Sequence, residues 1–172
     1  MTLVNVVNIL QKYKKKTIIC EKIIILKVKQ FKTILNMNKI KLGVLKETKT
    51  PPDRRVAITP KTAKEILNRF DNVEIFVQPS KLRAFDDNEF TEIRVTVQED
   101  LSNCDILMGV KEVKIDTFIN DKTYVFFAHV AKEQPYNRNM LLQMMQQNIT
   151  LLDYEYFTDE KGIRQVAFGK WA

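Results

Sequence analysis

The sequence predicts an α/β fold, a Rossmann-like three-layer sandwich with a mostly parallel sheet. Short apolar runs of strand length alternate with helical patterns along residues 38–172, which is typical of parallel strands joined by helical crossovers. Two of these runs, Ile106–Val110 and Tyr124–Ala128, are apolar throughout, as in strands covered on both faces. We therefore expect one domain over residues 38–172.

The first strand is expected at residues 40–45, and the loop 46–55 follows at its carboxyl end. Thr59 has the side chain of an N-cap, and Pro60 after it suits the first helical position. The spacing of the apolar residues that follow predicts a helix with a buried stripe at Ala63, Ile66, Leu67 and Phe70. A second strand is expected at residues 73–77.

Acidic residues at 86–87 suit the cap of a short helix carrying Phe90 and Ile93, and a small strand follows at 95–97. After the two central strands, residues 135–147 are expected to form a helix, and residues 149–152 another strand. The inward side chains of this helix are expected to be Leu141, Met144 and Met145.

Each central strand ends on a residue that can transfer a proton: Lys111 follows the first, and His129, the only histidine, follows the second. The carboxyl ends of neighbouring parallel strands lie at one rim, where ligands of such sheets bind. Lys111 and His129 would then share a ligand and suit acid–base chemistry. Taken alone, this stretch favours ordinary roles over catalysis: a solvated lysine at a strand end and a structural histidine.

The basic charge is confined to the start of the chain. Residues 1–39 contain nine lysines and one glutamate, whereas the remainder has 19 basic and 20 acidic residues. The charge therefore gives no evidence that the domain binds nucleic acid or a membrane. We expect residues 1–37 to be a disordered basic leader or a start-site extension upstream of Met37. The alternative is a membrane-surface anchor or targeting segment.

Several classes of site are unsupported. Cys20 and Cys104 form neither a disulfide framework nor a metal site, and we expect a reduced, cytoplasmic protein without a metal. The four glycines make no GxGxxG turn and no P-loop, so no cofactor-binding residue is expected in this chain. A GxSxG elbow is also absent from the sequence.

Four stretches together resemble the N-terminal domain shared by alanine dehydrogenase, the transhydrogenase alpha subunit and lysine-forming saccharopine dehydrogenase. The last two stretches resemble the saccharopine dehydrogenase branch most. The stretches are Lys46-Glu-Thr-Lys with Asp53-Arg-Arg-Val-Ala-Ile-Thr-Pro60, Gly109-Val-Lys-Glu112, Phe127-Ala-His-Val-Ala-Lys-Glu-Gln134, and Arg164-Gln-Val-Ala-Phe-Gly169.

The resemblance implies roles at matching positions. Lys111 and His129 match a catalytic acid–base pair, and Arg55 matches an arginine that holds a substrate carboxylate. A guanidinium binds a carboxylate through two parallel hydrogen bonds, which suits this role; Arg54 is the alternative. Further substrate-binding positions are implied at Lys49, Lys132, Glu112, Glu155 and Arg164.

The implied function is NAD-dependent oxidation of an amino-acid substrate: saccharopine, water and NAD give lysine and 2-oxoglutarate. In this family a glycine-rich NAD domain follows the last motif. The chain is therefore expected to be a truncated product or half of a split enzyme, inactive alone, with a separate dinucleotide-binding chain as a partner. The alternatives are an alanine dehydrogenase-type enzyme and a non-catalytic dicarboxylate-binding module.

Overall fold

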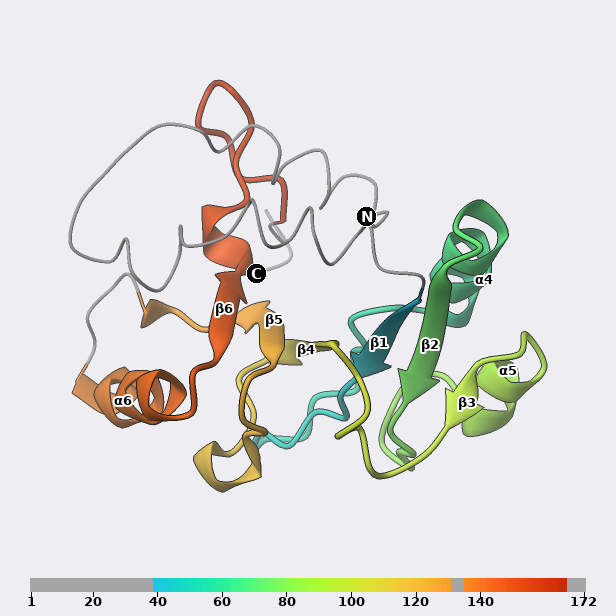
Figure 1. Cartoon of the computed structure of the whole chain (residues 1–172), viewed down its shortest axis with the longest axis horizontal. Coiled ribbons are helices and arrows are strands. Elements are labelled where there is room, and N and C mark those ends of the chain that lie inside the picture. The colour runs from blue at the N-terminus through green and yellow to red at the C-terminus, as the bar shows by residue number, and fades with distance from the viewer. Residues whose placement is uncertain (1–38, 131–134, 167–172) are drawn as a thin grey trace.

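The computed structural model describes residues 39–130 and 135–166, and these build a sheet of six strands (Figure 1). All neighbouring strands pair in parallel, in the order β3-β2-β1-β4-β5-β6. The predicted sheet is thus confirmed, and within the described residues it is parallel throughout. The strands are β1 (Ile40–Val44), β2 (Val73–Val77), β3 (Thr96–Val97), β4 (Ile106–Lys111), β5 (Thr123–Phe127) and β6 (Thr150–Asp153).

Within the described residues, three α-helices and three short 3-10 helices lie between or after the strands. They are α4 (Pro60–Arg69), α5 (Asp87–Thr91), α6 (Arg138–Gln146), η1 (Ile115–Thr117), η3 (Pro135–Asn137) and η4 (Tyr154–Tyr156). Thr59 caps α4 as predicted, since its hydroxyl accepts the backbone N–H of Thr62 at 3.2 Å. Asp86 and Glu89 form a capping box at α5, and Ile93 lies beyond the end of that helix.

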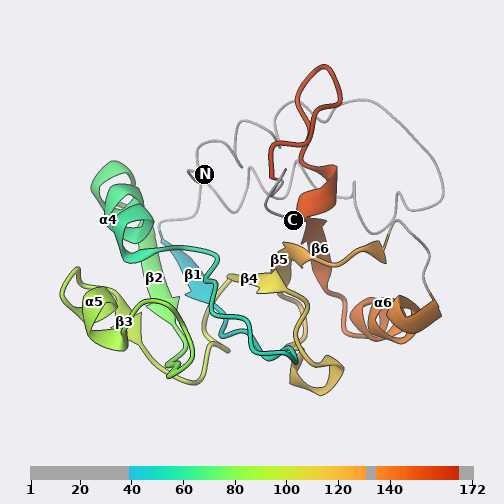
Figure 2. The ribbon, with the colours of Figure 1, turned by 180° about the vertical axis from the view of Figure 1, so that it is seen from behind.

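Both faces of the sheet are buried, which makes three layers. Ala63 of α4 and Phe90 of α5 pack in one core cluster with every second residue of the strands, such as Met108. Met144 of α6 packs in the other cluster, with Leu107 of the same strand. Figures 1 and 2 show α4 and α5 beside β2 and β3, and α6 beside β6.

The buried stripe of α6 differs from the predicted one. Met140 and Met144 are buried, Leu141 is partly buried, and Met145 is 58% exposed. Residues 135–137 form a 3-10 helix, and the α-helix begins only at Arg138. The face that meets the sheet is therefore rotated by one residue from the expected one, so the inward placement of Met145 was wrong.

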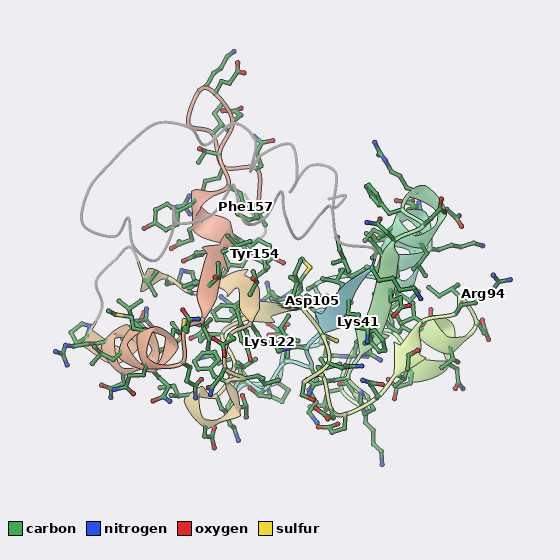
Figure 3. The ribbon with its side chains drawn as sticks, in the orientation of Figure 1. Lys41, Arg94, Asp105, Lys122, Tyr154 and Phe157 are labelled. Atoms are coloured by element: carbon green, nitrogen blue, oxygen red, sulfur yellow. The ribbon has the colours of Figure 1, made fainter. Side chains whose placement is uncertain are left out.

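The order of the strands determines where a ligand can bind. From β1 the strand order runs through β2 to β3 on one side. On the other side of β1 it runs through β4 to β5 and β6, so the direction of winding reverses between β1 and β4. In open α/β sheets, ligands bind outside the carboxyl ends of the strands at such a switch point. At the amino ends of the strands, Asp105 links β4 to β1 and β5. Its Oδ2 accepts the N–H of Lys41 at 2.8 Å, and its carbonyl accepts the N–H of Thr123 (Figure 3).

Candidate active site

Lys111 and His129 meet at one aromatic ring. Lys111 is the last residue of β4 and pairs with Phe127, the last residue of β5. The Nζ of Lys111 lies 5.9 Å from the centroid of the Phe127 ring, and the imidazole of His129 stacks on that ring at 6.1 Å. The structure therefore brings the two predicted groups to one rim, with a buried aromatic ring in contact with both.

The imidazole of His129 is oriented by Glu155. Its Nδ1 lies 3.1 Å from Oε1 of Glu155, a buried carboxylate that follows β6. If Nδ1–H donates this hydrogen bond, the neutral ring carries its lone pair on Nε2, the nitrogen then suited to take up a proton. Arg164, also predicted from the sequence, lies 3.6 Å from the same oxygen.

The backbone at His129 has an unusual conformation. Its φ is +54°, in the left-handed region that few residues other than glycine and asparagine adopt. The carbonyl of His129 accepts a hydrogen bond of 3.2 Å from the Nδ2 of Asn137, which is buried. Asn137 thereby stabilises the backbone of His129 in this conformation.

Arg55 is already paired within the protein. Its Nε donates to the two oxygens of Asp53 at 2.8 and 3.1 Å, and its Nη2 contacts Asp53 as well. The Arg55 guanidinium holds the pKa of Asp53 below its usual value, and the charge of Lys111 adds to this effect. Arg55 is thus held in the same cluster as Lys111, with 42% of its side chain exposed.

Lys49 and Glu112 form an ion pair of 2.6 Å that joins the loop 45–59 to the residue after β4. Lys49 is half exposed, whereas Glu112 is mostly covered. The pair brings two predicted substrate-binding residues together. Lys132, the remaining predicted position, lies outside the described residues.

Two further carboxyl groups at this rim were not predicted. Glu47 accepts the backbone N–H groups of Val110 and Lys111 at 2.7 and 3.0 Å, and burial raises its pKa. Asp153, the buried last residue of β6, accepts the N–H of Glu155 at 3.0 Å. Burial raises the pKa of Asp153 too, and its Oδ2 has no hydrogen-bond partner. An acidic residue at the end of an apolar run is the sequence signal that could have identified Asp153.

Tyr154 closes the apolar side of the rim. Its ring lies 5.1 Å from that of Phe127 and 5.6 Å from that of Phe157, just beyond β6 (Figure 3). Burial raises the pKa of Tyr154, and the charge of Glu47 raises it further. The tyrosine therefore stays a neutral phenol at physiological pH.

The described residues do not fit NAD in the manner usual for sheets of this order. The loop 45–59 between β1 and α4 contains no glycine, and no helix opens directly after β1. The carboxylate of Glu47 occupies backbone N–H groups at the switch point, where a phosphate would require positive charge. This rim therefore lacks the glycine turn that binds a pyrophosphate.

Among residues 39–130 and 135–166, no group of three histidine, cysteine or acidic side chains is arranged to hold a metal ion. Within the same ranges, none of the helices has the length and apolar character needed to cross a bilayer. The sequence expectations concerning residues 1–37 lie outside the described part of the chain.

The family described as alanine dehydrogenase/PNT, N-terminal domain, matches residues 43–172. The chain is 38% identical over 120 residues to the mitochondrial alpha-aminoadipic semialdehyde synthase of Bos taurus, covering 70% of this chain and 13% of that protein. It is 35% identical over 135 residues to the lysine-forming, NAD(+) saccharopine dehydrogenase of Yarrowia lipolytica, covering 76% of this chain and 36% of that enzyme. The chain thus spans a minor part of each relative.

Solved structures show the same fold. An L-alanine dehydrogenase superposes with a TM-score of 0.61 at 19% identity, covering 72% of this chain and 34% of that one. A transhydrogenase from Sinorhizobium meliloti superposes with a TM-score of 0.58 at 15% identity, covering 67% of this chain and 35% of that one. Both likenesses support the predicted Rossmann-like sandwich.

Proposed function

Because the chain belongs to the family of alanine dehydrogenase/PNT N-terminal domains, we propose that it forms the substrate-binding part of an NAD-dependent saccharopine dehydrogenase of the lysine-forming type. The observation that carries this proposal is the meeting of Lys111 and His129 at the Phe127 ring. Both groups stand at the carboxyl ends of neighbouring strands, where a ligand of such a sheet binds.

In the proposed reaction, saccharopine, water and NAD⁺ give lysine, 2-oxoglutarate, NADH and a proton. NAD⁺ would take up the hydride of the C–H bond beside the substrate amine, and water would then hydrolyse the C=N bond of the resulting imine. His129, oriented through Nδ1 by Glu155, accepts a proton at Nε2 from the substrate amine or from the attacking water. Lys111 exchanges a proton with the departing amine from the neighbouring strand end. NAD is bound by a part outside these 172 residues, either on the same polypeptide or on a partner chain.

The charges at the rim support a substrate that carries several carboxylates. Arg55 offers a fork of N–H donors, although it must share them with Asp53. Lys49 and Arg164 are likewise paired with acidic side chains and remain about half exposed. A ligand carboxylate would thus have to compete with these internal partners. A substrate with more than one carboxylate can replace several of them at once, so such substrates are favoured.

Calorimetry with the 172-residue chain tests the binding half of this proposal. Saccharopine is expected to bind, and Arg55→Lys is expected to weaken it by about tenfold or more, because an ammonium cannot make two parallel bonds to a carboxylate. Arg54→Lys is the matched control: it makes the same change one residue away, and its affinity should stay that of the unmodified chain. Equal losses in both variants would contradict the assignment of Arg55.

The catalytic half requires an assay with the NAD-binding part supplied. Lys111→Met in the complemented enzyme should reduce kcat by about a hundredfold or more, with saccharopine binding retained. Full activity in this variant would favour a binding module for dicarboxylates over an enzyme. Alanine in place of saccharopine, tested in the same assay, distinguishes the alanine dehydrogenase alternative: NAD reduction with alanine alone would favour it.

The location of the protein is a separate proposal. We propose the cytoplasm, which fits the unpaired, buried thiol of Cys104. The Bos taurus relative is mitochondrial by name, so fractionation of cells against markers for both compartments provides the test.

A further inference from the structure

Glu47 makes an unusual contact with the end of β4. In a regular strand, successive backbone N–H groups point to opposite sides. The pairing of β4 with β5 shifts register between Met108 and Lys111, and there the N–H groups of Val110 and Lys111 both donate to the carboxylate of Glu47, at 2.7 and 3.0 Å. An irregularity in the strand thus creates a small anion-binding site, and the chain fills it with its own carboxylate.

The neighbouring strand explains why these donors need a partner. The N–H of Leu45 donates to the carbonyl of Met108 at 2.8 Å, after which the chain leaves β1 and begins the loop 45–59. Beyond this point β4 has no β1 backbone alongside it. Glycine at 109 suits the local backbone, since a Cβ there would stand only 3.1 Å from the carbonyl of Lys111, whereas its 3.5 Å distance to Oε1 of Glu47 would be an ordinary contact.

We propose that Glu47 is a positioning residue: an internal anion that fixes the backbone of Lys111 and holds the loop of Arg55 against the end of β4. It also occupies the switch point of the sheet, where related sheets bind a nucleotide phosphate. Any contribution of Glu47 to substrate binding rests on the proposed function. Its fixing of the Lys111 backbone does not depend on that function.

The surroundings of Glu47 agree with this role. Asp53 and Arg55 interact with it electrostatically from its own loop, and Tyr154 does so from η4. Arg55 favours the ionised carboxylate, and Asp53 and burial oppose it. The two backbone hydrogen bonds stabilise the charged form of Glu47. They thereby offset part of the cost of placing a carboxylate in this half-buried position.

Hydrogen exchange of the backbone amides, measured by NMR on the 172-residue chain, tests the proposal without any substrate. Glu47→Ala should accelerate exchange at Val110 and Lys111 by roughly tenfold or more, with the amides of β2 unchanged. Formate or acetate, but not chloride at equal ionic strength, should restore protection by entering the vacated site. Glu99→Ala, which removes an exposed carboxylate paired with Lys46, is the matched control and should change neither amide.

Unchanged exchange at Val110 and Lys111 in Glu47→Ala would overturn the proposal, as would equal rescue by chloride. If Glu47→Ala fails to fold, Glu47→Gln decides: its amide retains only one acceptor oxygen, so one of the two N–H groups should lose protection. Saccharopine binding, measured on the same variants, reports separately on the proposed function. Loss of amide protection with no binding in the unmodified chain would refute only that function.

Discussion

Among the buried acidic residues at the rim, Asp153 is a side chain that lowers the stability of the fold at the position of the site. Asp153 is 3% exposed, and its Oδ2 lacks a hydrogen-bond partner. A carboxylate in such a place is destabilised by desolvation, which is why its pKa is raised. The imidazole of His129 lies close enough to offset part of this cost electrostatically.

Asp153→Asn should stabilise the fold at neutral pH by about 1 kcal/mol, because the amide keeps an acceptor for the N–H of Glu155 and carries no charge. The folded pKa of Asp153 is raised, so the native state binds the proton more tightly than the unfolded chain does. Stability from this group is greatest below the unfolded pKa and is lost as the pH rises through the folded pKa. The gain from Asp153→Asn should therefore shrink towards acid pH.

Melting temperatures of both proteins across this pH range provide the measurement. Asp116→Asn, which makes the same change at an exposed position in η1, is the control and should show no such pH-dependent gain. A difference between Asp153→Asn and the unmodified chain that persists undiminished in acid would contradict the burial of an ionised carboxyl.

At the scale of elements, the N-cap of α4 fixes the end of the loop that carries several of the site residues. Its N-cap Thr59 ends the loop 45–59, and the Thr59 hydroxyl accepts the N–H of Thr62. The cap therefore determines where the loop stops and where the helix starts. Its neighbour Ile58 is buried in the core beside α4, which anchors the same junction.

Thr59→Ala should reduce the free energy of unfolding by about 1 kcal/mol, because an N–H of the first turn loses its acceptor. Urea denaturation followed by far-ultraviolet circular dichroism measures the change. Thr48→Ala, in the exposed part of the same loop, serves as the control and should cost less than about 0.5 kcal/mol. Equal costs in the two variants would show that the cap contributes nothing beyond the lost side-chain atoms.

At the scale of the molecule, the two ends of the sheet carry different groups. Asp105 ties the strand starts of β1, β4 and β5 together at one edge, and the ionisable groups collect at the other. Several charged side chains at that rim already have a partner within the protein: Lys49 pairs with Glu112, Arg55 with Asp53, and Arg164 with Glu155. Binding must exchange internal ion pairs for contacts with the ligand.

The 172-residue chain alone should therefore bind saccharopine without measurable affinity for NAD, since the described rim has no glycine turn and places Glu47 at the switch point. Titration of NAD and of saccharopine into the same preparation by calorimetry measures both. Tight binding of NAD to the chain alone would contradict the division of the site between this domain and a second part.

The sequence by itself determined the parallel α/β architecture, the cap of α4, and the strand ends that carry Lys111 and His129. Each of these depends on residues close together in the chain, so periodicity and neighbouring residue types predict it. The tertiary structure alone decided that Glu47 reaches the amides of β4, that Glu155 reaches His129, and that Asp153 is buried. Such partners come from the packing of separate elements in space, which no local pattern records.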